Sequence, residues 1–538
     1  MIQRASLALL TAALMATGVA SGVPPAAAAP PAQAAPLDAQ AQALHVLNRL
    51  AFGPRPGDVE RVANMGVQRW IDEQLHPETI PLPPDLTARL ALLATVNRSA
   101  GDSLAEFIEL RREVRMDDEG AKQRRRQTEM RVARQAAEAR LLRAVESPRQ
   151  LEEVMVDFWY NHFNVFAGKG IDRALVTSYE RDAIRPYALG SFRALLGATA
   201  KHPAMLFYLD NVVSSAPRPD AKGKARGLNE NYARELMELH TLGADGGYTQ
   251  RDVTELARML TGWTFDQKRL ARAGETFRFD AGRHDRDTKT WLGREIAPTG
   301  QQEGEYALDV LAVHPSTAHH VSFELAQYFV SDEPPAALVD RMAATWMASH
   351  GDIRAVLATL FASREFMSAG AAGAKFKTPY QFVVSAVRAS GAPVANVMPL
   401  VNTMNQLGMP LYGCQTPDGY KNTQDAWLNP DALTRRIAFA TALAAGKLPL
   451  AAPPVDARPA MAAMAPNMAG SDAMPPPAPP EPVPAAPKPV AAQAPVDPAR
   501  LQATLAGSIS PRTRAIVQRN PDNLRAAMLL GSPDFMQR

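Results

Sequence analysis

Apolar positions recur with helical period along most of the chain between residues 45 and 200. The pattern predicts helices over residues 45–52, 56–75, 150–166 and 179–200, and one or two long helices over 104–145. Alternating apolar and polar positions are clearest at 275–280 and 288–292, and they predict a small hairpin with His284 and Asp285 at its tip. We therefore expect a predominantly α, multi-helical globular domain with a small β-hairpin insertion.

Two short helices rich in ionisable residues are predicted between residues 229 and 265. At about 100° per residue, Asn231, Glu235 and Glu238 share one face of the first helix, while Tyr232 and Leu236 lie on the opposite, buriable face. Gly243 is placed to end that helix in the left-handed conformation. Thr249 and Asp252 form the pattern of a capping box that opens the second helix.

The spacing of these acids leaves two interpretations open. An antiparallel pair of helices would bring Glu235, Glu238, Asp252 and Glu255 together, and such a cluster needs a cation or shifted pKa values. The alternative is that each helix has a solvated face whose acids pair with arginines one turn away. Spacing alone favours the solvated faces.

The two ends of the chain differ from the rest in composition. Residues 1–29 contain an arginine, an apolar run and small residues, which predicts a secretory signal peptide cleaved between residues 20 and 36. The protein is then exported by the general secretory route to the periplasm or the extracellular space. Cys414 is the only cysteine, so the exported chain cannot form an internal disulfide. No later stretch is long and apolar enough to predict a transmembrane segment.

Proline and alanine dominate residues 447–498, which predicts a disordered linker. It separates a main helical domain, 38–446, from a C-terminal helical segment, 499–538, that we expect to dock on the main domain. Methionines within the linker have the soft thioether ligands that hold Cu(I), although incidental methionine in an alanine-rich segment is the favoured interpretation. They are Met461, Met464, Met468 and Met474.

Charge and motifs exclude several classes of function. The net charge of +3 gives no general reason to expect nucleic acid as partner, and the basic stretch 111–143 lacks interleaved aromatics, which favours a solvated helix over a polyanion-binding one. The chain has no zinc-protease, serine-hydrolase, phosphate-loop or cysteine-metal motif. His162 lies in an aromatic helix, where a hydrogen-bonded core role is commoner than a functional one. His314, His319 and His320 lie at a polar helix start and are expected to cap and decorate it.

A set of long, ordered motifs resembles the bacterial family of large exported proteins catalogued as domain of unknown function 1800. The motifs are Leu-Asn-Arg-Leu-Ala-Phe-Gly-Pro at 47–54, Met-Val-Asp-Phe-Trp-Tyr-Asn-His-Phe at 155–163, His-Pro-Ala-Met-Leu-Phe-Tyr-Leu-Asp at 202–210, Asn-Glu-Asn-Tyr-Ala-Arg-Glu-Leu at 229–236 and Leu-Thr-Gly-Trp at 260–263. The chain departs from the family pattern at Tyr160, where a second histidine is common, and at 412–420, where a Pro-Pro-Asn-rich segment is usual. The resemblance implies a sulfatase-like exported partner and no established activity.

The resemblance also selects polar residues from three separated segments as a mixed site. We expect Glu235, His162 and His284 to be catalytic, and Arg234, Asn161, Asn229 and Asn231 to bind substrate. Glu230 and Asp285 are expected to hold a divalent cation if the site uses one. The first hypothesis is thus an envelope or extracellular hydrolase-like enzyme with a polar pocket. The alternative is a non-catalytic periplasmic or cell-surface scaffold that works with the sulfatase-like partner and uses the same charges as a buried ion-pair network.

Overall fold

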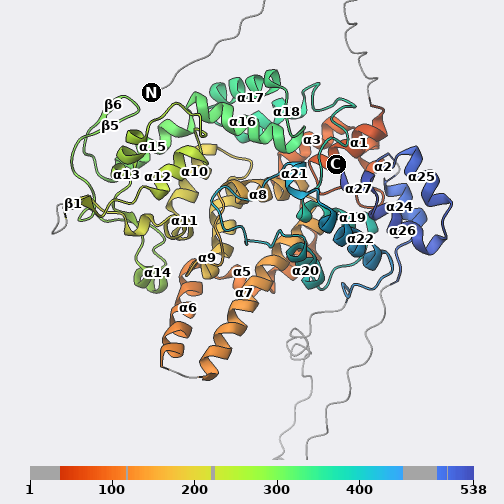
Figure 1. The fold of residues 1–538 in the computed structure, drawn as a ribbon, viewed down its shortest axis with the longest axis horizontal. Coiled ribbons are helices and arrows are strands. Elements are labelled where there is room, and N and C mark those ends of the chain that lie inside the picture. The colour runs from red at the N-terminus through yellow and green to blue at the C-terminus, as the bar shows by residue number, and fades with distance from the viewer. Residues whose placement is uncertain (1–36, 117–118, 220–224, 452–493, 506) are drawn as a thin grey trace, which may run out of the picture. The chain divides into compact units, whose positions relative to one another are not determined.

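Helices predominate in the described part of the chain, as the periodic placement of its apolar residues predicts (Figure 1). The computed structural model describes residues 37–116, 119–219, 225–451, 494–505 and 507–538. The predicted signal peptide and most of the predicted linker, with its four methionines, lie outside these residues. Within the described part, no helix is both long enough and apolar enough to span a bilayer.

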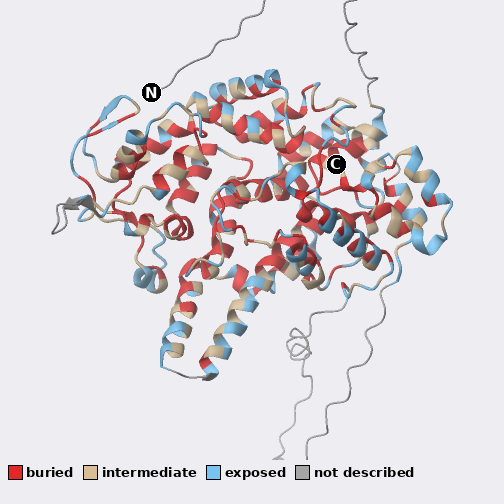
Figure 2. Cartoon of the chain, viewed as in Figure 1, coloured by how far each residue is buried: buried red, intermediate tan, exposed pale blue. Residues whose placement is uncertain are grey.

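The first helices surround the N-terminal part of the core. They are α1 (Ala39–Arg49), α2 (Asp58–Met65), α3 (Val67–Leu75), η1 (Pro77–Thr79), α4 (Pro84–Ala91), α5 (Ala94–Asn97), α6 (Ala100–Arg115) and α7 (Glu119–Glu146). The helix predicted over 56–75 is broken at Gly66, whose φ of 92° leaves the helical region. Helices α6 and α7 contact each other along an antiparallel pair, with exposed side chains at its outer end (Figures 1 and 2).

The middle of the chain supplies most of the site. Its elements are α8 (Gln150–His162), α9 (Asp172–Ser178), the π-helical η2 (Tyr179–Ile184), η3 (Arg185–Tyr187), α10 (Phe192–Lys201), α11 (Pro203–Tyr208), η4 (Asn211–Val213), α12 (Asn231–Glu238), α13 (Gln250–Met259) and α14 (Gln267–Ala273). The predicted capping box forms as expected, because Thr249 and Asp252 each accept a backbone hydrogen bond from the other. Gly243 adopts the predicted left-handed conformation with φ of 83°.

The remaining helices follow the strands. They are α15 (Gln301–Ala312), α16 (Pro315–Phe329), α17 (Ala336–Ser349), α18 (Ile353–Phe361), α19 (Pro379–Ser390), α20 (Met398–Gln406), α21 (Gln424–Trp427), α22 (Pro430–Ala444), α24 (Pro498–Leu505), α25 (Pro511–Gln518), α26 (Asp522–Leu530) and α27 (Pro533–Met536). Helix α26 packs against α22, and Leu529 and Leu530 are buried there. The last residues, 533–538, reach the segment before α19, where the backbone oxygen of Lys375 accepts a hydrogen bond from Arg538 N at 2.7 Å.

The strands pair differently from the predicted hairpin. In the described part they are β1 (Arg218–Pro219) with β2 (Ala225–Arg226), β3 (Trp263–Thr264) with β4 (Arg278–Phe279), and β5 (Lys289–Trp291) with β6 (Arg294–Ile296), all antiparallel. The predicted pairing of 275–280 with 288–292 is therefore wrong. Leu292 and Gly293 both have positive φ, which is the conformation of a two-residue hairpin turn, and this tight turn pairs β5 with its immediate neighbour.

Helix α8 lies in the core and is buried on nearly every side (Figure 2). Arg140 of α7 is fully enclosed beside it, where its guanidinium contacts Asp157 Oδ1 at 2.5 Å and Glu180 Oε2 at 3.4 Å. Tyr160 packs its ring against this guanidinium and donates its hydroxyl to Val165 O. Tyr160, the position at which the resemblance implies a second histidine, is therefore part of the helix packing.

Candidate functional site

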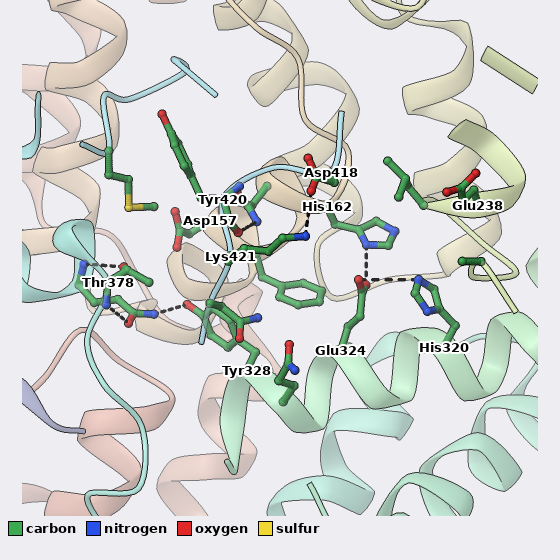
Figure 3. Close-up of a pocket in the computed structure, with 18 residues that line it drawn as sticks. Asp157, His162, Glu238, His320, Glu324, Tyr328, Thr378, Asp418, Tyr420 and Lys421 are labelled. Carbon is green, nitrogen blue, oxygen red and sulfur yellow. Dashed lines mark hydrogen bonds and ion pairs between the residues drawn. The ribbon is translucent and has the colours of Figure 1, made fainter. Parts of the chain in front are cut away.

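A cavity of ≈ 290 Å³ lies between α8, α16, the end of α12 and the loop 409–422 (Figure 3). Its volume is close to the lower end of the range of about 300–1,000 Å³ that small-molecule sites occupy. Apolar contacts come from Phe158, Leu239 and Met409, and the rest of the lining is mainly polar or charged. We take this cavity as the candidate site.

His162 and Glu324 form the central pair of the cavity. Nδ1 of His162 lies 2.7 Å from Glu324 Oε2, and Nε2 lies 3.2 Å from the backbone oxygen of His240. Both ring nitrogens therefore face acceptors, an arrangement that an imidazolium satisfies completely. The His162 side chain is 3% exposed and that of Glu324 is 31% exposed, so the carboxylate is the member of the pair that a ligand can reach.

Several cations stabilise the charged form of Glu324. Burial alone would raise the pKa of its carboxyl, but the charge and hydrogen bond of His162, together with His320 and Lys421, hold that pKa below its ordinary value. His320 Nε2 lies 3.7 Å from Glu324 Oε1, one turn earlier on the same helix (Figure 3). Glu324 is consequently ionised at neutral pH.

The sequence interpretation missed Glu324 and treated His320 as decoration of a helix start. Their separation of four residues places both on one face of α16, and this spacing was the available signal. His314 alone has the predicted capping role, because its Nδ1 accepts a hydrogen bond from Ser316 N at 3.1 Å. His319 is exposed and faces Asp340 at 3.8 Å.

The side chain of Asn161 binds the backbone of the loop 409–422 at one side of the cavity. Its amide oxygen accepts from Tyr420 N at 2.7 Å and its amide nitrogen donates to Tyr420 O at 2.8 Å. Asn164, three residues later, donates to the backbone oxygens of Cys414 and Thr416. The segment 412–420, which departs from the family pattern, is thus held against α8 by two asparagine side chains, and it places Asp418 and Tyr420 in the cavity lining.

Three other carboxylates line the cavity. Asp157 is 8% exposed, and burial raises its pKa against the opposing effect of Arg140. Asp418 Oδ2 lies 2.8 Å from Lys421 Nζ. Glu238, at the end of α12, has no hydrogen bond or ion pair with any residue that the structure describes.

Residues at the start of α12 lie outside this lining. Asn229 accepts from Asn231 N at 2.9 Å, which fixes the first turn of the helix. Glu230 accepts hydrogen bonds from Thr254 and Gln250 of α13, and Arg234 donates to Gln250 at 2.8 Å. These contacts join α12 to α13 near the surface.

Glu235 lies between this surface network and the cavity. It is half-buried, and burial raises its pKa, with further contributions from Glu238 and Asp418. Its carboxyl therefore belongs to the same electrostatic neighbourhood as two lining residues, although it does not itself line the cavity. The four-carboxylate cluster does not form, because Asp252 accepts from Leu292 N and Glu255 pairs with Arg258.

His284 and Asp285 lie in a separate buried ion network. His284 Nε2 contacts Glu303 Oε1 at 2.9 Å and its Nδ1 contacts Thr261 O at 2.8 Å. Lys289 Nζ lies 2.8 Å from Glu303 Oε2, and both of those side chains are fully buried. Both oxygens of Asp285 bind Arg258. The structure therefore does not bring His284 and Asp285 into the cavity with His162.

Among the residues that the structure describes, no three His, Cys, Asp or Glu side chains are grouped to hold a metal ion. Glu230 and Asp285, the predicted ligands, belong to the two different networks above. The divalent cation stays a prediction.

Comparison with family models gives one finding. A model described as a protein of unknown function (DUF1800) matches residues 45–537, nearly the whole chain. Searches of the curated proteins and of the solved structures returned no significant match.

Proposed function

The chain belongs to the DUF1800 family of proteins of unknown function, and from this premise we propose that its cavity is the active site of an exported hydrolase-like enzyme for small polar substrates. The observation that supports the proposal most is the pair formed by His162 and Glu324, in which a buried histidine orients a carboxylate that is open to the cavity. A base oriented by a third group is the arrangement that general acid–base catalysis requires.

Glu324 is the general base in this scheme. Its Oε1 is not engaged by His162, so it is free to accept a proton from a water molecule that attacks the substrate. The lowered pKa of Glu324 reduces its basicity but keeps the carboxylate ionised into the acidic range. We therefore expect activity to persist below pH 4.5, the ordinary pKa of a glutamate, before the acidic limb of the pH profile appears.

His320 is the general acid in this scheme. It lines the cavity beside Glu324 and is partly exposed, so its ring can reach a leaving group on the substrate. His162 acts as a positioning residue, because its ring is enclosed and both nitrogens are engaged. Glu235, predicted from the sequence to be catalytic, thus gives way in the proposal to Glu324, and Glu235 contributes charge beside the cavity.

The test is a screen of esters, amides and glycosides with the wild type and with Glu324→Gln. Loss of the general base should lower kcat by about 10²- to 10⁴-fold while the midpoint of thermal unfolding stays nearly unchanged. His319→Gln is the matched control for His320→Gln, since the two histidines are adjacent on α16 but only His320 lines the cavity. Equal activity of Glu324→Gln and the wild type on every substrate that is turned over would refute the catalytic role.

Export and partnership belong to the same proposal. The apolar run near the N-terminus supports secretory export, and N-terminal sequencing of the mature protein should find a first residue between 21 and 37. Cross-linking in the native envelope tests the scaffold alternative. A catalytically silent chain that is cross-linked to a sulfatase-like protein would favour the scaffold over the enzyme.

A further inference from the structure

Three amide side chains of the cavity lining each direct one of their two N–H groups at a protein acceptor. Gln381 Nε2 donates to Tyr328 Oη at 3.1 Å, and Gln327 Nε2 donates to Asp332 O at 3.1 Å. Asn161 donates to the loop backbone. The carboxylates of the lining are therefore the groups that a ligand with donors of its own can engage best.

The open acceptors are carboxylate oxygens. Asp157 is more than nine-tenths buried and lines the cavity, and its Oδ2 has no hydrogen-bond partner among the described residues, since Arg140 binds Oδ1. Both oxygens of Glu238 are likewise without a protein partner in the described part of the chain. Glu324 Oε1 has only the longer contact of 3.7 Å to His320.

The lining also carries a net negative charge. Asp157, Glu238, Glu324 and Asp418 face Lys421, which gives a formal charge of −3 when the lining histidines are neutral and −1 when both are protonated. Electrostatic interactions inside a partly enclosed site are stronger than in water. With neutral histidines, the lining repels an anionic ligand such as a phosphate or sulfate ester and attracts a cation, even though Arg140 offsets the charge of Asp157.

From these observations we propose that the cavity recognises a small, hydroxyl-bearing substrate with a primary ammonium group, such as an amino sugar. The ammonium lies among Glu238, Asp418 and Glu324, where it donates to the open carboxylate oxygens of Glu238 and Glu324 and is attracted by the charge of Asp418. Hydroxyl groups on the body of the ligand donate to Asp157, and the volume of ≈ 290 Å³ suits a ligand of about one sugar ring. The inference rests on the proposed site but not on its chemistry.

Calorimetric titration of the full chain with D-glucosamine, D-glucose and D-glucose 6-phosphate tests this inference. Glucosamine should bind at least tenfold more tightly than glucose, and its affinity should fall as salt is added. Glucose 6-phosphate should bind more weakly than glucose. Glucosamine binding no tighter than glucose, or tighter binding of the phosphate ester, would overturn the inference.

Variants assign the selectivity to the cavity. Glu238→Gln should reduce the preference for glucosamine over glucose about tenfold, and Asp418→Asn should act in the same direction. Glu275→Gln, at an exposed position outside the lining, is the matched control and should leave all three affinities unchanged. An unchanged preference in both cavity variants contradicts the proposal. The wild type separates the two hypotheses: glucosamine selectivity without any hydrolysis refutes only the enzyme, whereas hydrolysis that Glu324→Gln abolishes, without any preference for glucosamine over glucose, refutes only this inference.

Discussion

Lys289→Met should destabilise the chain strongly, because the lysine neutralises a carboxylate that has no access to water. Lys289 and Glu303 are both fully buried, and their charged atoms lie 2.8 Å apart. Burial alone would raise the pKa of Glu303, but hydrogen bonds from His284 and Lys289 hold it below its ordinary value. Removing the lysine leaves Glu303 with His284 and the backbone N–H of Gly300 as partners.

The expected loss in the free energy of unfolding follows from the burial of Glu303 without its ion partner. Breaking a buried ion pair by removing one partner typically costs about 3–5 kcal/mol, because the remaining charge stays desolvated. This corresponds to an increase of roughly 10²- to 4 × 10³-fold in the unfolding equilibrium constant. Adding Glu303→Gln to Lys289→Met removes the stranded charge and keeps an acceptor for Gly300 N, so the double variant should be more stable than the single one.

Urea unfolding followed by tryptophan fluorescence measures both variants, since Trp291 and Trp263 are buried in the same region. Lys268→Met at an exposed position of α14 is the matched control, with an expected change within about 0.5 kcal/mol. A loss below about 1 kcal/mol in Lys289→Met, or a double variant no more stable than the single one, would refute the reasoning. The outcome also decides whether His284, predicted from the sequence to be catalytic, belongs to a stabilising network.

Three further outcomes are expected. Asn161→Ala removes two hydrogen bonds to Tyr420 and should cost about 1–3 kcal/mol and raise KM; an unchanged KM would show that the loop does not shape the site. Gly304→Ala places a methyl group 2.4 Å from the Trp263 ring and should cost about 1–3 kcal/mol in urea unfolding, whereas Gly190→Ala, with 3.6 Å of clearance, should be tolerated. Burial and the charge of Arg49 lower the pKa of His45 in the folded chain from 6.5 to about 3. On acidification the unfolded chain therefore protonates His45 before the folded chain does, and the free energy of unfolding falls as the pH drops below 6.5. This difference in proton binding lowers the free energy of unfolding by about 2 kcal/mol at pH 5. His45→Phe should remove that part of the acid-induced loss in the free energy of unfolding, measured by urea unfolding at pH 7 and pH 5.

Local patterns predicted the helices well because their signals lie within a few residues. The Thr249 capping box and the left-handed Gly243 were readable in this way. The strand pairing was predicted wrongly because the choice between two possible turns is not visible in the local pattern. The tight turn at Leu292 and Gly293 competes with a longer loop, and two positive φ angles at these residues were not anticipated from leucine.

The site was only partly predictable because its contacts join distant parts of the chain. Asn161 and His162 were both selected from the sequence and both line the cavity, while their roles there stay predictions. Glu324 was missed because it lies 162 residues from its partner His162, and no local spacing reports such a pairing. His284 shows the opposite case, because its contacts with a carboxylate and a carbonyl resemble those of His162 although it lies in a buried network.

The way in which the C-terminal helices rejoin the main chain has a consequence for how this protein can vary. Leu450 O accepts hydrogen bonds from Ala395 N and Asn396 N, and Val496 N donates to Ala444 O at the end of α22. Residues on both sides of the segment 452–493 are therefore held by backbone hydrogen bonds to the main helical domain, at Leu450 and at Val496. In general, a flexible connection between two fixed points lengthens at a cost of only about 0.6 kcal/mol for each doubling of its length. A reporter domain inserted between these two anchored points should therefore leave the cavity and its chemistry intact.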